Sequence, residues 1–158
     1  MYKNKGKKIM EILYEKLVKI LKEKEQTISC MESCTGGFFN SQITNVDGAS
    51  EVLKVGLVTY SNEYKIKFGI NSKTIDEFTV YSTEVAREMA KNISIFAAST
   101  IGIGITGQIG NENINKVYAS IYMKNKFYDY VIETKGINKI EKKKYVTDFI
   151  AKELLKLV

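Results

Sequence analysis

The stretch from Thr27 to Phe39 limits most strongly what this chain can fold into. Its apolar run, residues 27–31, stops at the segment E-S-C-T-G-G, residues 32–37, and a helix-like pattern follows. This order predicts a strand, a tight turn and the N-terminus of a helix. Glycine lets the backbone of such a turn come close to a ligand, and the free N–H groups of a helix's first turn favour negative charge. We therefore expect a phosphate or a developing oxyanion to bind near this turn.

Ser33 and Cys34 stand at the mouth of the predicted turn. A hydroxyl or a thiol at a strand–turn–helix junction is well placed to act as a nucleophile. The alternative is that Ser33 or Thr35 only caps the helix, because both residue types are favoured at the N-cap. The turn by itself favours the capping interpretation.

The composition excludes several classes of protein. A chain of 158 residues that is 44% hydrophobic and 27% charged fits one soluble globular domain, residues 1–158. No apolar run approaches the roughly 20 residues that cross a bilayer, and the N-terminal segment lacks a signal peptide's apolar core, so we expect a cytoplasmic protein. With two cysteines and no histidine, the chain is expected to hold no structural metal.

The basic residues argue against nucleic acid as a partner. The formal charge is +6, but the basic residues are spread along the chain, and Arg87 is the only arginine. The bidentate guanine contacts that arginine makes in the major groove are therefore nearly unavailable. Because histidine is absent, any general base must be Lys, Tyr, Asp, Glu or Cys.

The spacing of apolar residues predicts alternating helices and strands. Helices are expected at about 7–24, 37–46, 61–68, 83–95 and 138–158, and strands at 27–31, 53–60, 100–105, 117–124 and 127–134, with a hairpin turn at 125–126. Ser61 and Ser82 are expected to cap the helices that follow them. Gly102 and Gly104 predict that a neighbouring chain segment or a ligand approaches the 100–105 strand closely.

The order of these elements predicts the fold class and the place of the site. We expect an α/β fold, a three-layer α/β/α sandwich with a mixed, mostly parallel sheet, because only the last two strands form an antiparallel hairpin. Ligands of such folds bind where strands end at their carboxyl edge. The loops after Met31, Tyr60 and Ile105 are therefore expected to form one site, and the loop at 106–113 could hold an anion.

Three segments closely resemble the CinA C-terminal domain family. They are E-S-C-T-G-G at 32–37, G-L-V-T-Y-S-N-E-Y-K at 56–65 and T-G at 106–107, and the resemblance covers nearly the whole chain from Thr27 onward. Family members of known activity are nicotinamide mononucleotide deamidases of the PncC type, which are amidohydrolases of pyridine nucleotide salvage. The resemblance implies that Ser33, Tyr60 and Lys65 are catalytic.

The resemblance also carries expectations about ligands and partners. It implies a small nucleotide substrate, no cofactor, no metal and a homo-oligomer, dimeric or larger. Glu32 either orients Lys65 or caps a helix, and the sequence leaves both roles open. The residues expected to bind substrate are Glu32, Thr35, Gly36, Gly37, Thr106 and Gly107.

Two departures from the family pattern leave other functions open. The family continues its third loop as T-G-I-A-G-P-G-G, whereas residues 108–113 here contain no proline and only one glycine. Lys139 stands where the family tends to carry an arginine, and a lysine lacks the planar fork that grips phosphate. The alternatives are a catalytically weak or inactive nucleotide-binding module and, less favoured, a role linked to competence or DNA damage.

The chemistry can be assigned to residues of this chain. Acyl transfer from an amide needs a nucleophile, a base, an oxyanion site and an acid for the leaving ammonia. Ser33 would attack, the N–H groups near residues 35–37 would hold the oxyanion, and Lys65 with Tyr60 would move protons, with the general base left open between them. Lys65 could serve as the base only if its pKa fell from about 10.4 to roughly 7–8. Cys34 ranks second as nucleophile.

Overall fold

The structure is a computed structural model that describes residues 3–136 and 138–158, with the backbone alone for residues 3–11 and Lys135. A five-stranded sheet with strand order β2-β1-β3-β4-β5 forms its centre. The strands are β1 (Ile28–Glu32), β2 (Leu53–Val58), β3 (Ile101–Gly107), β4 (Ile114–Met123) and β5 (Lys126–Lys135).

The sheet is mixed, as the sequence predicts, but the expectation of a mostly parallel sheet is wrong. β1 pairs in parallel with β2 and β3, whereas β3 with β4 and β4 with β5 are antiparallel. The antiparallel ladders are also the longer ones, since β4 and β5 have 10 residues each and β1 has 5. The hairpin of β4 and β5 therefore makes up a larger part of the sheet than was expected from the number of strands.

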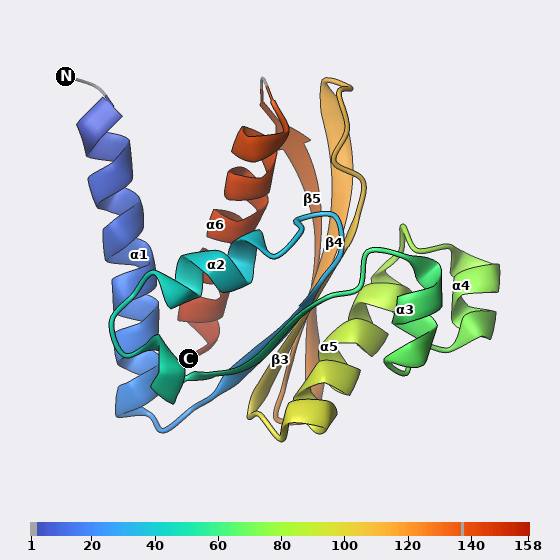
Figure 1. Cartoon of the computed structure of the whole chain (residues 1–158), viewed down its shortest axis with the longest axis horizontal. Helices are drawn as coiled ribbons and strands as arrows, with labels where there is room; N and C mark the ends of the chain where they lie inside the picture. The colour runs from blue at the N-terminus through green and yellow to red at the C-terminus, as the bar shows by residue number, and fades with distance from the viewer. Residues whose placement is uncertain (1–2, 137) are drawn as a thin grey trace.

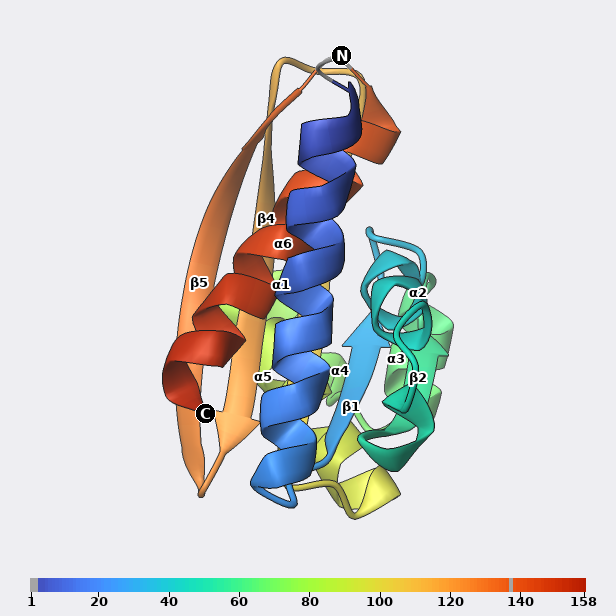
Figure 2. The same ribbon diagram turned by 90° about the vertical axis from the view of Figure 1, so that its left-hand side faces the viewer.

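Helices cover both faces of the sheet, which confirms the three-layer α/β/α architecture. On one face lie α1 (Lys3–Glu23), α2 (Phe38–Thr44) and α6 (Lys139–Leu157), and on the other lie α3 (Asn62–Lys67), α4 (Ser72–Phe78) and α5 (Thr83–Ala97), as Figure 1 shows. Figure 2 shows α1 and α6 side by side over the sheet. Among the described residues, no helix is long and apolar enough to cross a membrane.

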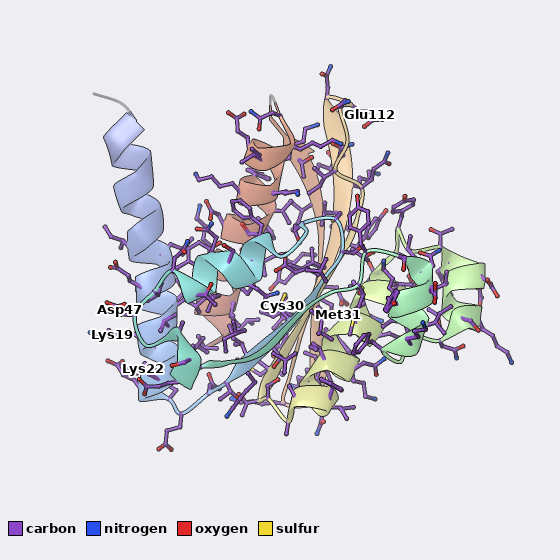
Figure 3. The ribbon with its side chains drawn as sticks, in the orientation of Figure 1. Lys19, Lys22, Cys30, Met31, Asp47 and Glu112 are labelled. Atoms are coloured by element: carbon purple, nitrogen blue, oxygen red, sulfur yellow. The ribbon has the colours of Figure 1, made fainter. Side chains whose placement is uncertain are left out.

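The two faces of the sheet bury separate apolar clusters. The larger cluster contains Cys30 of β1, and the smaller one contains Met31 together with residues of α5. Successive side chains of a strand point to opposite faces, and Figure 3 shows Cys30 and Met31 on either side of β1. β1 is fully buried because it lies between two strands and between two helical layers.

The glycines of β3 make room for α5. A Cβ atom at Gly102 would lie 1.9 Å from the carbonyl oxygen of Ala90, and one at Gly104 would lie 2.2 Å from that of Ala86. The close neighbour that these glycines predict is therefore the backbone of a helix.

Most predicted elements are present, with two differences. α4 was not predicted: none of its side chains is fully buried, and Ile75 alone packs against the smaller apolar cluster. The hairpin turn lies at Lys124–Asn125, one residue earlier than expected, and both residues have positive φ, 52° and 60°. Positive φ at both central residues is what a two-residue hairpin loop requires, and asparagine tolerates it.

Candidate active site

The turn between β1 and α2 depends on its two glycines. Gly36 and Gly37 have φ of 62° and 93°, in the left-handed region where a side chain is strained. Gly37 is the N-cap of α2 and no N-cap side chain bonds there, so the interpretation of Ser33 or Thr35 as the helix cap is wrong. The capping acceptor comes instead from the end of β1.

Glu32 supplies that acceptor. Its carboxylate is fully buried and accepts hydrogen bonds from the N–H groups of Gly37 and Phe39 at 3.2 Å and from that of Asn40 at 2.8 Å. It also accepts from the side-chain amide of Asn40 at 2.8 Å and from the hydroxyl of Thr35. Of the two roles left open for Glu32, the structure shows the helix cap. This carboxylate fixes the turn that presents Ser33.

Lys65 points at Ser33 from the neighbouring helix. Its Nζ donates to Ser33 Oγ at 3.0 Å and to the carbonyl oxygens of Thr59 and Tyr60 at 2.8 and 3.4 Å. Ser61 caps α3 by accepting from the Tyr64 N–H, which starts the helix directly after β2 and places Lys65 one turn later. Lys65 is only 1% exposed.

The surroundings of Lys65 lower the pKa of its amine. Within the described residues, no carboxylate forms an ion pair with Lys65 that would offset its burial. Burial lowers the pKa of Lys65 below the ordinary value of a lysine, because desolvation disfavours the charged form. A neutral amine 3.0 Å from a serine hydroxyl can take that hydroxyl's proton.

A pocket of about 200 Å³ opens beside this pair. Of the residues that the sequence assigns to the site, Ser33, Tyr60, Lys65 and Gly107 line it, and the side chain of Tyr60 is 74% exposed. The loops after β1, β2 and β3 meet here, as the fold class predicts, and the Ser33 N–H donates to the Ile105 carbonyl at 2.9 Å. Larger hollows along α1 and α6 contain none of the predicted catalytic residues.

The other predicted binding residues are not part of the pocket lining. Thr35 donates its hydroxyl to Glu32, and Thr106 donates its hydroxyl to the Val80 carbonyl at 2.7 Å. Both threonines are buried, so they shape the turn and the end of β3. Direct contact of substrate with Glu32, Thr35, Gly36, Gly37 or Thr106 stays a prediction.

The N–H groups expected to hold an oxyanion are partly occupied. Gly36 donates to the Ser33 carbonyl at 3.0 Å, and Gly37 donates to Glu32. Within the part of the chain that the structure describes, the N–H groups of Cys34 and Thr35 donate to no other residue. They follow Ser33 directly and are the backbone donors of this turn that remain for an oxyanion.

Cys34 also lines the pocket, but as a thiol and not a thiolate. Burial is the largest cause that raises its pKa to about 12, and the nearby charges of Lys65 and Lys143 lower it by less. The thiolate is the reactive form of cysteine, so little of it exists near neutral pH. The geometry and the charge state both favour Ser33 over Cys34 as the nucleophile.

Sequence reasoning missed part of the pocket wall. Val80 and Tyr81 come from the segment between α4 and α5, and Asn62 begins α3. Gln108 and Ile109 belong to the third loop, which was expected at the site as a loop and not by these residues. The only local signal near Val80 and Tyr81 is the helix cap at Ser82, which says where α5 begins and nothing about a pocket.

The fold and the pocket together define an α/β sandwich domain with a histidine-free serine–lysine site at the carboxyl edge of its parallel strands. The chain belongs to the CinA family, because the family model for the CinA C-terminal domain matches residues 10–153. A CinA-like protein of Kosmotoga olearia is 37% identical over 94% of this chain and 38% of its own length.

Solved structures agree with this assignment. The competence or damage-inducible protein of Enterobacter asburiae superposes with a TM-score of 0.88 at 25% identity, covering 94% of this chain and 97% of the other. A CinA superfamily protein of Escherichia coli has the same fold, with a TM-score of 0.86 over 94% and 90% of the two chains. The chain spans well under half the length of the curated relatives it matches.

Proposed function

We propose that this domain is an amidohydrolase that converts nicotinamide mononucleotide to nicotinic acid mononucleotide and ammonia in pyridine nucleotide salvage. One observation carries the proposal: a buried lysine amine lies 3.0 Å from a serine hydroxyl at the wall of a pocket. The resemblance to the PncC-type deamidases supplies the substrate.

In the first half of the reaction, the Lys65 amine accepts the proton of Ser33 Oγ as that oxygen attacks the amide carbon. The free N–H groups of Cys34 and Thr35 stabilise the negative charge that develops on the amide oxygen. Protonated Lys65 then gives its proton to the departing nitrogen, the C–N bond breaks and ammonia leaves an acyl ester on Ser33.

In the second half, a water molecule loses a proton to Lys65 and attacks the ester, and the proton returns to Ser33 as the carboxylate product leaves. Lys65 is the general base in this scheme because its Nζ contacts the hydroxyl directly. Tyr60 stands at the exposed rim, where we assign it contact with the substrate and a role in passing protons to solvent.

An ammonia assay tests the proposal. Purified protein incubated with nicotinamide mononucleotide should release ammonia, and Ser33→Ala should reduce the rate by about four to six orders of magnitude, as loss of a nucleophile does. Ser50→Ala serves as a matched control, since it removes an exposed serine hydroxyl in the short helix Ala49–Glu51 and leaves the pocket lining intact. Equal release by wild type and Ser33→Ala, with both folded, would refute the mechanism.

A second candidate is a nucleotide-binding module without turnover. The third loop favours it, because residues 108–113 depart from the family's glycine-rich pattern and Gln108 and Ile109 still line the pocket. Calorimetry separates the two candidates: saturable binding of the mononucleotide without ammonia release supports the module, and no binding excludes it.

The family resemblance also leads us to propose a cytoplasmic homo-oligomer. Light scattering coupled to gel filtration should give a mass of at least two chains of 17.9 kDa. A single-chain mass at the working concentration of the assay would contradict this part of the proposal.

A further inference from the structure

Lys142 of α6 is a second buried lysine near the site, and the mechanism does not use it. It is 2% exposed, and its Nζ donates to the carbonyl oxygen of Gly110 at 2.9 Å, to the side-chain oxygen of Asn115 at 2.8 Å and to the carbonyl oxygen of Glu112. We propose that Lys142 is a positioning residue that holds the 108–113 loop as a fixed wall of the substrate pocket, so that this lysine governs how tightly the substrate is held.

The bonding around Lys142 explains why a charge is kept in this buried place. An ammonium group has three N–H donors, and here all three have an oxygen acceptor. A buried charge is tolerated when it is fully hydrogen-bonded. Removing it takes one of two donors from the buried Asn115 side-chain oxygen and takes the Lys142 donor from the carbonyl oxygens of Gly110 and Glu112. These three bonds tie the loop to α6.

Two further hydrogen bonds of the loop involve Asn115, which also accepts from Lys142. The Gly110 N–H donates to the Asn115 side-chain oxygen at 3.1 Å, and the Asn115 amide donates to the Glu112 carboxylate at 3.1 Å. At its start, the Gln108 N–H donates to the Lys116 carbonyl at 3.0 Å. Figure 3 shows Glu112 at the outer tip of the loop. The hydrogen bonds of Lys142 join this loop to α6.

The loop matters for substrate because its first residues form the pocket wall. Gln108 and Ile109 line the pocket, and Ile109 packs against the larger apolar cluster. Gly110, whose carbonyl Lys142 holds, follows them directly. Neither loop residue touches the Ser33–Lys65 pair through a hydrogen bond, so release of the loop should change the fit of the substrate and spare the chemical step.

The first test measures the loop without any assay of activity. In Lys142→Met, amide hydrogen exchange of the peptide covering 108–113 should quicken about tenfold or more, because the loop loses its hydrogen bonds to α6 and opens locally. Exchange in β1 and α3 should stay unchanged. Lys152→Met is the matched control, since Lys152 is an exposed lysine of the same helix, and it should exchange like the wild type.

The second test is kinetic and rests on the proposed function. With nicotinamide mononucleotide, Lys142→Met should raise KM about tenfold while kcat stays within about threefold, as expected when binding is lost equally from ground and transition states. Lys142→Arg, which keeps a charged donor, should recover part of the KM. If wild type shows no turnover, the proposed function fails while the exchange result still decides the role of Lys142.

Clear results would overturn the inference. Unchanged exchange in 108–113, an increase spread evenly over the sheet and helices, or a fall in kcat in place of a rise in KM would each do so. If Lys142→Met does not fold, Asn115→Ala takes its place, because it removes the acceptor that Lys142 and Gly110 share. It must meet the same criteria.

Discussion

Two loops form the walls of the pocket, and they are held in opposite ways. The turn at 33–37 is organised by Glu32, a buried carboxylate that accepts from the backbone just after it. The loop at 108–113 is organised by Lys142, a buried ammonium that donates to backbone carbonyls about thirty residues before it. One buried charged side chain therefore holds each wall. Glu32 is acidic and close in sequence to the turn, whereas Lys142 is basic and distant in sequence from its loop.

The difference shows which part of the site the local sequence can specify. Glu32 and the N–H groups it binds lie within eight residues, so a short motif contains the whole arrangement. Lys142 reaches its loop only after α6 has packed against the sheet, and the bond to Gly110 joins residues 32 positions apart. The turn should therefore behave as a local unit, and the loop should depend on the tertiary fold.

The largest expected effect belongs to Lys65, which lies in α3 and donates to Ser33 at the start of the turn. Lys65→Met should lower the rate of ammonia release by about three to four orders of magnitude, and adding Ser33→Ala should lower it little further, because nucleophile and base act as one unit. Lys67→Met is the matched control, since Lys67 is an exposed lysine of the same helix paired with Glu63. Additive losses in the double variant would show that Lys65 and Ser33 act separately.

The next effect is on stability. Glu32→Gln should reduce the free energy of unfolding by about 2–3 kcal/mol, because an amide nitrogen would face buried N–H donors that now bind a carboxylate. Denaturant unfolding measures this, with Glu63→Gln as an exposed control. If Glu32→Gln lost less free energy of unfolding than Asn115→Ala in the third loop, the turn would not be the more self-contained of the two segments.

The pH dependence separates the two buried lysines. The reaction needs neutral Lys65, whose pKa lies below the ordinary value, so the rate should rise about tenfold per pH unit below that pKa and then level off. The folded state also binds fewer protons than the unfolded chain between this pKa and about 10.4, so stability should rise with pH there, and Lys65→Met should flatten the rise. Lys142→Met should leave the position of the rate profile unchanged.

The smallest effect is expected at Cys34. Cys34→Ala should retain the rate of ammonia release within about threefold, because the buried thiol is protonated near neutral pH and Ser33 carries the chemistry. The measurement is the same ammonia assay with the protein before and after alkylation. If the rate of Cys34→Ala were as low as that of Ser33→Ala, Cys34 and not Ser33 would be the nucleophile.

Much of the framework could be predicted from the sequence because its signals are local. Ser61 and Ser82 begin α3 and α5 as expected, since a cap acts on N–H groups two or three residues away. The motif at 32–37 and the lysine at 65 fell at the carboxyl edge because parallel strands end together there. α4 could not be predicted, because a short helix that packs only Ile75 against the core has too weak an apolar period to detect.

What the sequence determined by itself is the order of elements, the glycine turn, the candidate nucleophile Ser33 and the choice of Lys65 or Tyr60 as the base. Only the tertiary structure decided that Glu32 serves the helix and leaves Lys65 alone, that the N–H groups of Cys34 and Thr35 stay free, and that Lys142 is buried against the third loop. The physical reason is burial. A charged side chain has the same identity in water and in the interior, but its pKa and its partners are set by the segments that pack around it, and those segments are distant in the chain.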